Sequence, residues 1–195
     1  MNRVAKRSKL LAEALAVTTA SDVDFQGELV HWEHVTVPEL SIVLVYVELT
    51  ARVHKLHHWQ AKADPFYGDH LLFDRLSGDV AGFVDKVAEK AIGLGGAENV
   101  DLVLRTEALA RLTNAVMNRA DGTVMPDGTD LTRRSLAATV SLVYVLDTAA
   151  ESMRTAGTLT RGVDNMLAGI EDTVEDAFYL LKRRIAAADP RERTR

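Results

Sequence analysis

The feature that most constrains the fold of this chain is the length over which it runs without a helix-breaking residue. Neither proline nor glycine occurs between Pro38 and Asp64, or from Asp130 to Thr155. Because strands are bounded by frequent turn residues, such stretches indicate long helices. The only strand-like signal is the β-branched run from Val43 to Val47, and we expect its helical flanks to override it. Apolar residues make up 47% of the chain and aromatic residues only 6%, which fits helices packed on helices.

Capping and turn residues divide the chain into four long helices. Thr36, Pro38 and Glu39 have the pattern of a helix start: a capping hydroxyl, a proline in the first turn and an acid near the positive end of the dipole. We expect long helices at about 38–63, 69–94, 130–155 and 160–188, and a less periodic helical crossover at 97–120. This layout predicts an all-α fold, a ferritin-like four-helix bundle with a crossover helix between the second and third long helices.

One domain accounts for most of the chain, because 195 residues suffice for one well-buried core and are few for two. We expect residues 1–20 to form a basic N-terminal arm with a short helix at 9–17, residues 21–188 to form the bundle, and residues 189–195 to form a charged tail. Residues 18–36 are predicted to be an irregular connection. Within it, Phe25 and Trp32 are available to pack against the body.

The composition excludes several classes of site. The chain has no cysteine, so disulfides, thiolate metal sites and a cysteine nucleophile are excluded, and any metal must be held by His, Asp or Glu. The longest apolar run, 42–47, is too short to cross a bilayer, and the basic start lacks the apolar stretch of a signal peptide. We therefore expect a cytoplasmic protein without a membrane partner. A net charge of -5 gives the body no general attraction for nucleic acid.

Two partial metal sites lie at opposite ends of the second predicted helix. Asp85 and Glu89 are four residues apart, so both carboxylates leave one face, although acids with this spacing mostly face water. His70 lies fifteen residues before Asp85, which places the two about 22 Å apart along a helix. His58 can approach His70, because the chain reverses between them.

A second copy of the chain would complete both partial sites. If a two-fold axis sets the second helices antiparallel, each histidine pair faces the partner's carboxylate pair, which gives two identical sites per dimer. Two imidazoles and two carboxylates without sulfur suit ferrous iron, and also manganese or zinc.

These residues resemble the ferroxidase signature of the Dps family of mini-ferritins. His58 before Trp59, His70 twelve residues on, Asp85 fifteen further and Glu89 four after that fall in the family's register, and the segment closes with Leu94-Gly95-Gly96. The likeness covers about 39–96. It implies a hollow shell of twelve subunits, a dodecamer, in which ferrous iron is oxidised, preferentially by hydrogen peroxide, and ferric mineral collects. It also implies that His58 and His70 of one subunit bind iron with Asp85 and Glu89 of its neighbour, and that Trp59 beside the site supplies an electron and quenches radicals.

Several side chains near this signature have more than one interpretation. His54 is a further ligand, a group that supports a ligand or a surface residue, and the last two are favoured; His57 crowds the same half-site. Asp74 either reaches a second metal or orients His70. Trp59 is either a packing residue or the electron donor. The basic residues 182–184 are expected mainly to oppose the helix dipole.

Three functional hypotheses follow. The first is iron oxidation and storage. The second is a non-enzymatic DNA-binding nucleoid protein, with an idle or zinc-occupied metal site, in which arms carrying Arg3, Lys6, Arg7 and Lys9 make many weak, salt-dependent phosphate contacts. The third is a helical interaction scaffold. Iron-dependent peroxide consumption separates the first from the others, and a salt-sensitive gel shift separates the second from the third.

Overall fold

The computed structural model describes residues 24–32, 34–62, 66–118 and 128–188. Over these residues all regular structure is helical, which confirms the all-α prediction. The elements in chain order are α2 (Phe25–His31), α3 (Pro38–Gln60), α4 (Phe66–Ala81), α5 (Val84–Gly95), the 3-10 turn η2 (Ala97–Val100), α6 (Leu102–Asn118), α7 (Gly128–Thr155) and α8 (Arg161–Ala188). The predicted arm at 1–20 and the tail at 189–195 lie outside the described residues.

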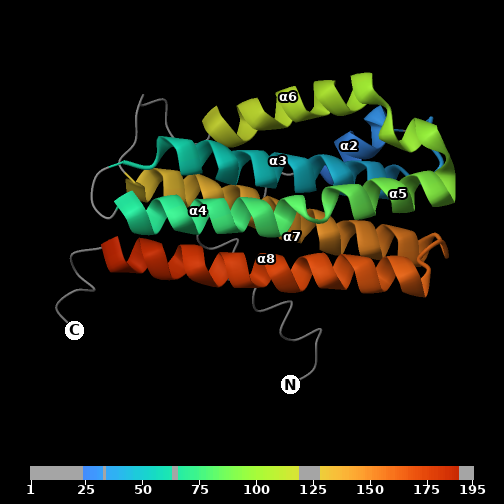
Figure 1. Cartoon of the computed structure of the whole chain (residues 1–195). Coiled ribbons are helices and arrows are strands. Elements are labelled where there is room, and N and C mark those ends of the chain that lie inside the picture. The colour runs from blue at the N-terminus through green and yellow to red at the C-terminus, as the bar shows by residue number, and fades with distance from the viewer. Residues whose placement is uncertain (1–23, 33, 63–65, 119–127, 189–195) are drawn as a thin grey trace.

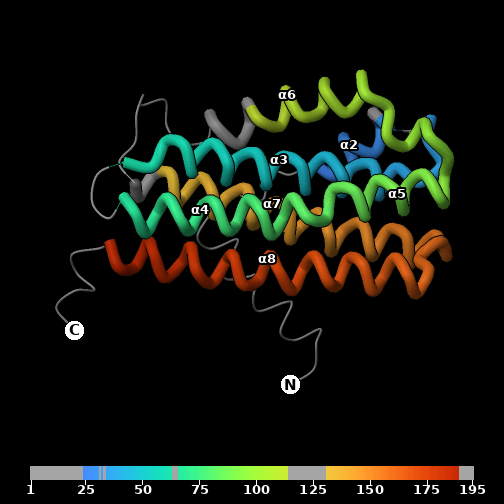
Figure 2. The backbone as a smooth tube through the Cα atoms, viewed as in Figure 1, coloured from blue at the N-terminus to red at the C-terminus, as the bar shows by residue number. Residues whose placement is uncertain are grey.

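The long helices pack side by side in a closed arrangement. α3 packs on α4 and on α7, and α8 packs on both of these helices, so the four close a ring (Figure 1). α5 continues the direction of α4, and α6 then carries the chain back along α3 before α7 begins (Figure 2). The crossover between the second and third long rods is therefore helical, as predicted.

α3 is the central helix of the fold. Every residue from 39 to 51 is buried, so this part of α3 has no solvent face. A helix that is apolar all round must be covered on all sides. α4, α5 and α7 cover one side, and α6, α2 and η2 cover the rest. Phe25 and Trp32 pack into the core as expected, with 2% and 1% of their surfaces exposed.

The start of α3 is fastened differently from the prediction. Pro38 is the first residue of the helix and Val37 is its N-cap residue. No side-chain hydrogen bond from the N-cap residue caps this end, so the prediction that Thr36 caps the helix is wrong. Instead the Val37 N–H donates to Asn99 Oδ1 at 2.9 Å, and the Ser41 hydroxyl donates to the Asn99 carbonyl at 2.8 Å. Gly95 permits this approach, because a Cβ there would lie 2.3 Å from Asn99 Nδ2.

Three predicted segments have different bounds. The single helix expected at 69–94 is two helices, α4 and α5, because the Phe83 N–H bonds to the Val80 carbonyl three residues back and Gly82 has low helix propensity. The crossover expected as one helix at 97–120 is η2 followed by α6. The connection expected to be irregular contains α2, whose Gly27 N–H is capped by Asp24 at 2.8 Å.

α7 and α8 agree closely with the helices expected at 130–155 and 160–188. α7 is also long and apolar enough to span a membrane by length and composition, over Leu131–Thr155. However, 67% of that apolar window is buried inside the protein, as in the core helix of a globular fold.

Candidate metal centre

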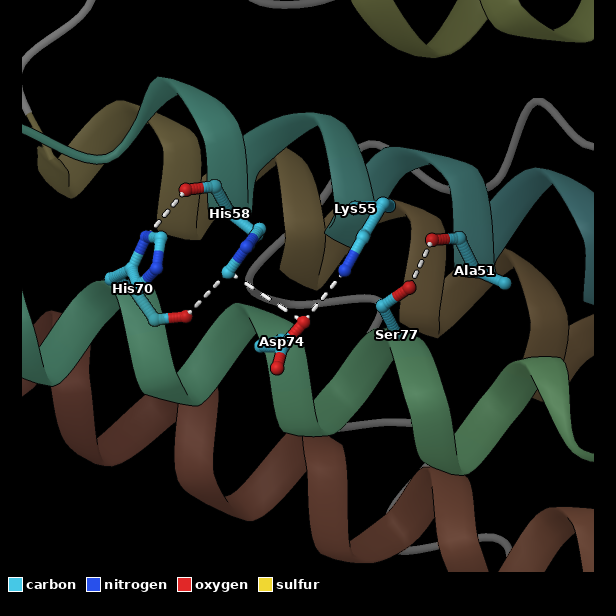
Figure 3. Close-up of polar contacts among 6 residues, drawn as sticks. All are labelled: Ala51, Lys55, His58, His70, Asp74 and Ser77. Carbon is cyan, nitrogen blue, oxygen red and sulfur yellow. Dashed lines mark hydrogen bonds and ion pairs between the residues drawn. The ribbon is translucent and has the colours of Figure 1, made fainter.

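Two histidines hold each other where α3 ends and α4 begins. The rings of His58 and His70 are stacked with centroids 3.8 Å apart (Figure 3). His58 Nδ1 lies 2.9 Å from the His70 carbonyl oxygen, and His70 Nδ1 lies 3.0 Å from the His58 carbonyl oxygen. A carbonyl only accepts, so each Nδ1 carries a hydrogen, and in a neutral ring with this tautomer the lone pair lies on Nε2. Histidines that bind metals are commonly oriented in this way.

Asp74 lies beside this pair and is engaged by a lysine. Its Oδ1 accepts a hydrogen bond from Lys55 Nζ at 2.7 Å and lies 3.7 Å from His58 Nδ1. The hydrogen bond from Lys55 holds the pKa of Asp74 below its usual range, and nearby positive charge acts in the same direction. Asp74 thus pairs with Lys55 and approaches His58, and its predicted roles toward His70 or a second metal stay predictions. A cation at Asp74 Oδ1 would compete with the ammonium group of Lys55.

The residues next to the histidine pair in the sequence include exposed aromatic and apolar side chains. Trp59 is 69% exposed, Tyr67 71% and Leu71 48%. The Phe66 ring lies 5.3 Å from the His70 ring between centroids. The interpretation of Trp59 as a packing residue is wrong for a single chain, because no core covers its ring.

The carboxylate half-site lies on α5. Asp85 and Glu89 are both exposed, with Asp85 in the first turn of the helix. Between the two half-sites lie most of α4 and the break at Gly82 and Phe83. Among the residues that the structure describes, no three His, Asp or Glu side chains come together as a metal-holding group. One chain thus presents the histidines and the acids as two separate partial sites.

His54 and His57 belong to the core rather than to the half-site. Both are fully buried, which rules out the surface interpretation of His54, and both Nδ1 atoms contact the Ser135 hydroxyl, at 3.0 Å and 2.7 Å. Thr139 donates its hydroxyl hydrogen to the Ser135 carbonyl, so its oxygen must accept the hydrogen of His54 Nε2. His54 Nδ1 then has no hydrogen and accepts one from the Ser135 hydroxyl. Because that hydroxyl has a single hydrogen, its oxygen accepts the hydrogen bond from His57 Nδ1. His57 Nε2 is buried without a hydrogen-bond partner in the described structure.

Burial keeps these two imidazoles neutral. It lowers the pKa of His54 to about 3, with a contribution from His57. It lowers the pKa of His57 to about 4, with a contribution from the charge of Arg134. Ser135 and Thr139 engage both ring nitrogens of His54 and Nδ1 of His57, so of these two rings it is His57 that keeps a nitrogen, Nε2, without a hydrogen-bond partner in the described structure.

Sequence reasoning missed two ion pairs. Asp69 in the first turn of α4 is 2% exposed and accepts two hydrogen bonds from one edge of the Arg184 guanidinium, from Nε at 2.5 Å and from Nη2 at 2.8 Å. Arg184 thus forms a buried ion pair in addition to lying at the C-terminal end of the helix dipole.

On α2, Glu28-Leu29-Val30-His31 has the Glu-x-x-His spacing that ferritin di-iron sites use twice. Glu28 is instead paired with Arg111 of α6 at 2.6 Å.

The predicted site residues thus fall into two groups on one chain. His58, His70 and Asp74 meet where α3 ends and α4 begins, and Asp85 and Glu89 stand on α5. The basic arm on which the DNA-binding hypothesis depends lies outside the described residues. A scan against protein-family models and a search of curated proteins both give no match to this chain.

Proposed function

We propose that this chain is a ferritin-like subunit of the Dps type, which oxidises ferrous iron at sites shared by two copies and stores the ferric product in a hollow cytoplasmic shell. Hydrogen peroxide takes one electron from each of two ferrous ions and, with two protons, leaves as two waters. The observation that carries the proposal is the reciprocal bonding of His58 and His70, which leaves two Nε2 lone pairs ready for a metal.

The donor chemistry supports iron as the substrate. The two imidazoles are borderline donors, and Asp85 and Glu89 add hard oxygen donors from an exposed surface. Trp59, exposed and next to His58, is placed to meet oxidising species formed at such a site. The chain contains no sulfur ligand from cysteine that would favour a structural zinc site.

The exposed face of α4 and α5 supports a two-fold dimer. Residues with three- and four-residue spacing stay exposed along α4, at the break and along α5, and we call them the stripe: Tyr67, Leu71, Asp74, Gly78, Gly82, Asp85, Glu89 and Ile92. Apolar side chains stand at both ends of the stripe and glycines near its middle. Antiparallel pairing of two such stripes would bring the apolar ends together and set the histidines of each copy against the acids of the other.

Gly78 marks where the two-fold axis would cross. It is eight residues after His70 and seven before Asp85. A Cβ at Gly78 would meet nothing within 4 Å in the single chain, so the subunit itself gives no steric reason for glycine. Glycine inside a helix costs about 1 kcal/mol relative to alanine. Close approach of a second α4 at this point accounts for that cost.

The first test is ferrous oxidation by the D85A/E89A variant, followed by stopped-flow absorbance with peroxide as the oxidant. We expect the fast initial phase to disappear while the assembly keeps its size by light scattering. The matched control is D172A/D176A, which removes an exposed acid pair with the same spacing from α8. Unchanged initial kinetics in D85A/E89A would defeat the proposal.

A mixing experiment tests whether the site is shared. H58A/H70A subunits and D85A/E89A subunits are each inactive in the proposed scheme, but a mixed dimer has one intact site and one empty of ligands. Random pairing makes half of the dimers mixed, so co-refolding should restore roughly a quarter of the wild-type rate. A rate no higher than that of the separate variants would show that the site does not lie between copies.

A further inference from the structure

One buried ion pair attaches the first turn of α4 to α8. Among residues 66–71, which form the start of α4, only Asp69 is buried, and Phe66, Tyr67, Gly68 and Leu71 are exposed. Asp69 accepts two hydrogen bonds from Arg184, which lies near the end of α8. A two-bonded arginine and carboxylate pair fixes orientation as well as distance. The pair therefore sets both the position and the direction of this turn against α8.

His70 follows Asp69 directly, and both of its bonds to His58 depend on where that turn lies. One bond is accepted by the His70 backbone carbonyl, and the other is donated by the His70 ring to the backbone of α3. A small shift of the turn along or around its axis would lengthen both together. The two histidines would then lose the carbonyl partners that keep hydrogen on Nδ1 and leave Nε2 free.

We propose that Asp69 and Arg184 are positioning residues for the histidine half-site. By clamping the first turn of α4 to α8, they hold His58 and His70 in the tautomer that carries hydrogen on Nδ1 and, in the neutral ring, the lone pair on Nε2. The proposal rests on the proposed function only for its metal-binding consequence. The control of the tautomers by the ion pair is tested independently of metal binding.

The experiment compares the full chain with the D69L/R184M variant. Replacing both partners of a buried ion pair by apolar residues often leaves stability unchanged, so this variant removes the orienting bonds without leaving a buried charge. Protein labelled with ¹⁵N at histidine is sedimented and its ring nitrogens are read by solid-state NMR at weakly alkaline pH, with H58Q and H70Q assigning the lines. Co²⁺ titration followed by absorbance gives the metal affinity.

We expect wild-type His58 and His70 to show protonated Nδ1 and unprotonated Nε2. D69L/R184M should show a mixture of tautomers at both rings and bind Co²⁺ about tenfold or more weakly, the usual effect of losing a group that orients a ligand. The control E28L/R111M removes a comparable pair between α2 and α6 and should change neither reading. R184K keeps the positive charge but loses the bidentate hydrogen bonding. Its tautomer populations and its Co²⁺ affinity should lie between those of the wild type and the double variant.

Each outcome has a defined meaning. Wild-type tautomers in D69L/R184M would overturn the proposal, and so would equal changes in E28L/R111M. If D69L/R184M does not fold, the same criterion applies to R184K, whose unchanged tautomers would overturn it. If the tautomers shift as expected but wild-type protein binds no Co²⁺, the positioning role is supported and the proposed metal site fails.

Discussion

Acidification should destabilise this protein through two imidazoles that its surface does not reveal. His54 and His57 are fully buried between α3 and α7, with pKa values lowered to about 3 and about 4. In the unfolded chain both return to about 6.5. At a pH between the folded and unfolded pKa values, the two imidazoles are protonated in the unfolded state but not in the folded state. The free energy of unfolding therefore falls as the pH drops below 6.5, and it levels off only near the folded pKa values.

The size of the effect at about pH 5 depends little on the folded pKa values. As long as both lie below that pH, each unfolded imidazole gains RT ln(1 + 10^1.5), about 2 kcal/mol. The two together should lower the free energy of unfolding by about 4 kcal/mol relative to about pH 8. This loss is a large part of the stability of a typical domain.

The assay is equilibrium urea unfolding at about pH 8 and about pH 5, at one fixed protein concentration so that any association is held constant. Wild type is compared with H54Q, H57Q and the double variant, because glutamine keeps a hydrogen-bonding side chain next to Ser135 and does not titrate. Contributions from all other groups cancel in the comparison. The double variant should lack about 4 kcal/mol of the wild-type pH dependence, and each single variant about half of that. An equal pH dependence in all four proteins would refute the argument.

Replacing glycine by alanine should change the free energy of unfolding in opposite directions at two positions. G95A should destabilise the chain by roughly 1–3 kcal/mol in thermal unfolding, because its Cβ would meet Asn99 and Val37, whereas G93A on the open side of α5 should stabilise it by up to about 1 kcal/mol. G78A should weaken association in sedimentation experiments, whereas G169A, an equally open helical glycine on α8, should not. If G78A stabilises the assembled protein as G169A does, no second copy approaches at Gly78.

The long helices were predictable because their signals are local. α3, α7 and α8 run for 23, 28 and 28 residues with no proline after their first residue, and their bounds agree closely with those expected from capping and turn residues. α4 and α5 were merged because a single helix-interior glycine such as Gly82 is only weakly unfavourable. Whether the chain bends there is decided by how α4 packs on α3 and α8 and how α5 packs on α3 and η2. α2 was missed because it is only seven residues long.

The buried histidines could not be assigned from periodicity. A helix normally shows which side chains are buried by its apolar stripe, but α3 is covered on every side over residues 39–51 and has no such stripe to extend to His54. Ser135 and Thr139, which explain why a histidine is tolerated there, are more than seventy positions away in the chain. The contact of Lys55 with Asp74 is likewise set by the packing of α3 on α4.

The approach of His58 to His70 and the shared exposure of Asp85 and Glu89 were each predictable, because they depend on one chain reversal and on a local spacing. The proposed union of the two half-sites depends on a surface that no local pattern encodes. In a two-fold dimer every contact occurs twice, so the apolar ends of the stripe, at Tyr67, Leu71 and Ile92, would become buried in the same step that brings His70 to the partner's acids. Metal binding and pairing would then be thermodynamically linked. By reciprocity, the factor by which a bound metal strengthens the dimer must equal the factor by which pairing strengthens metal binding. A dimer whose dissociation is indifferent to ferrous iron or Co²⁺ would therefore have to be a different dimer, with its metal ligands away from the interface.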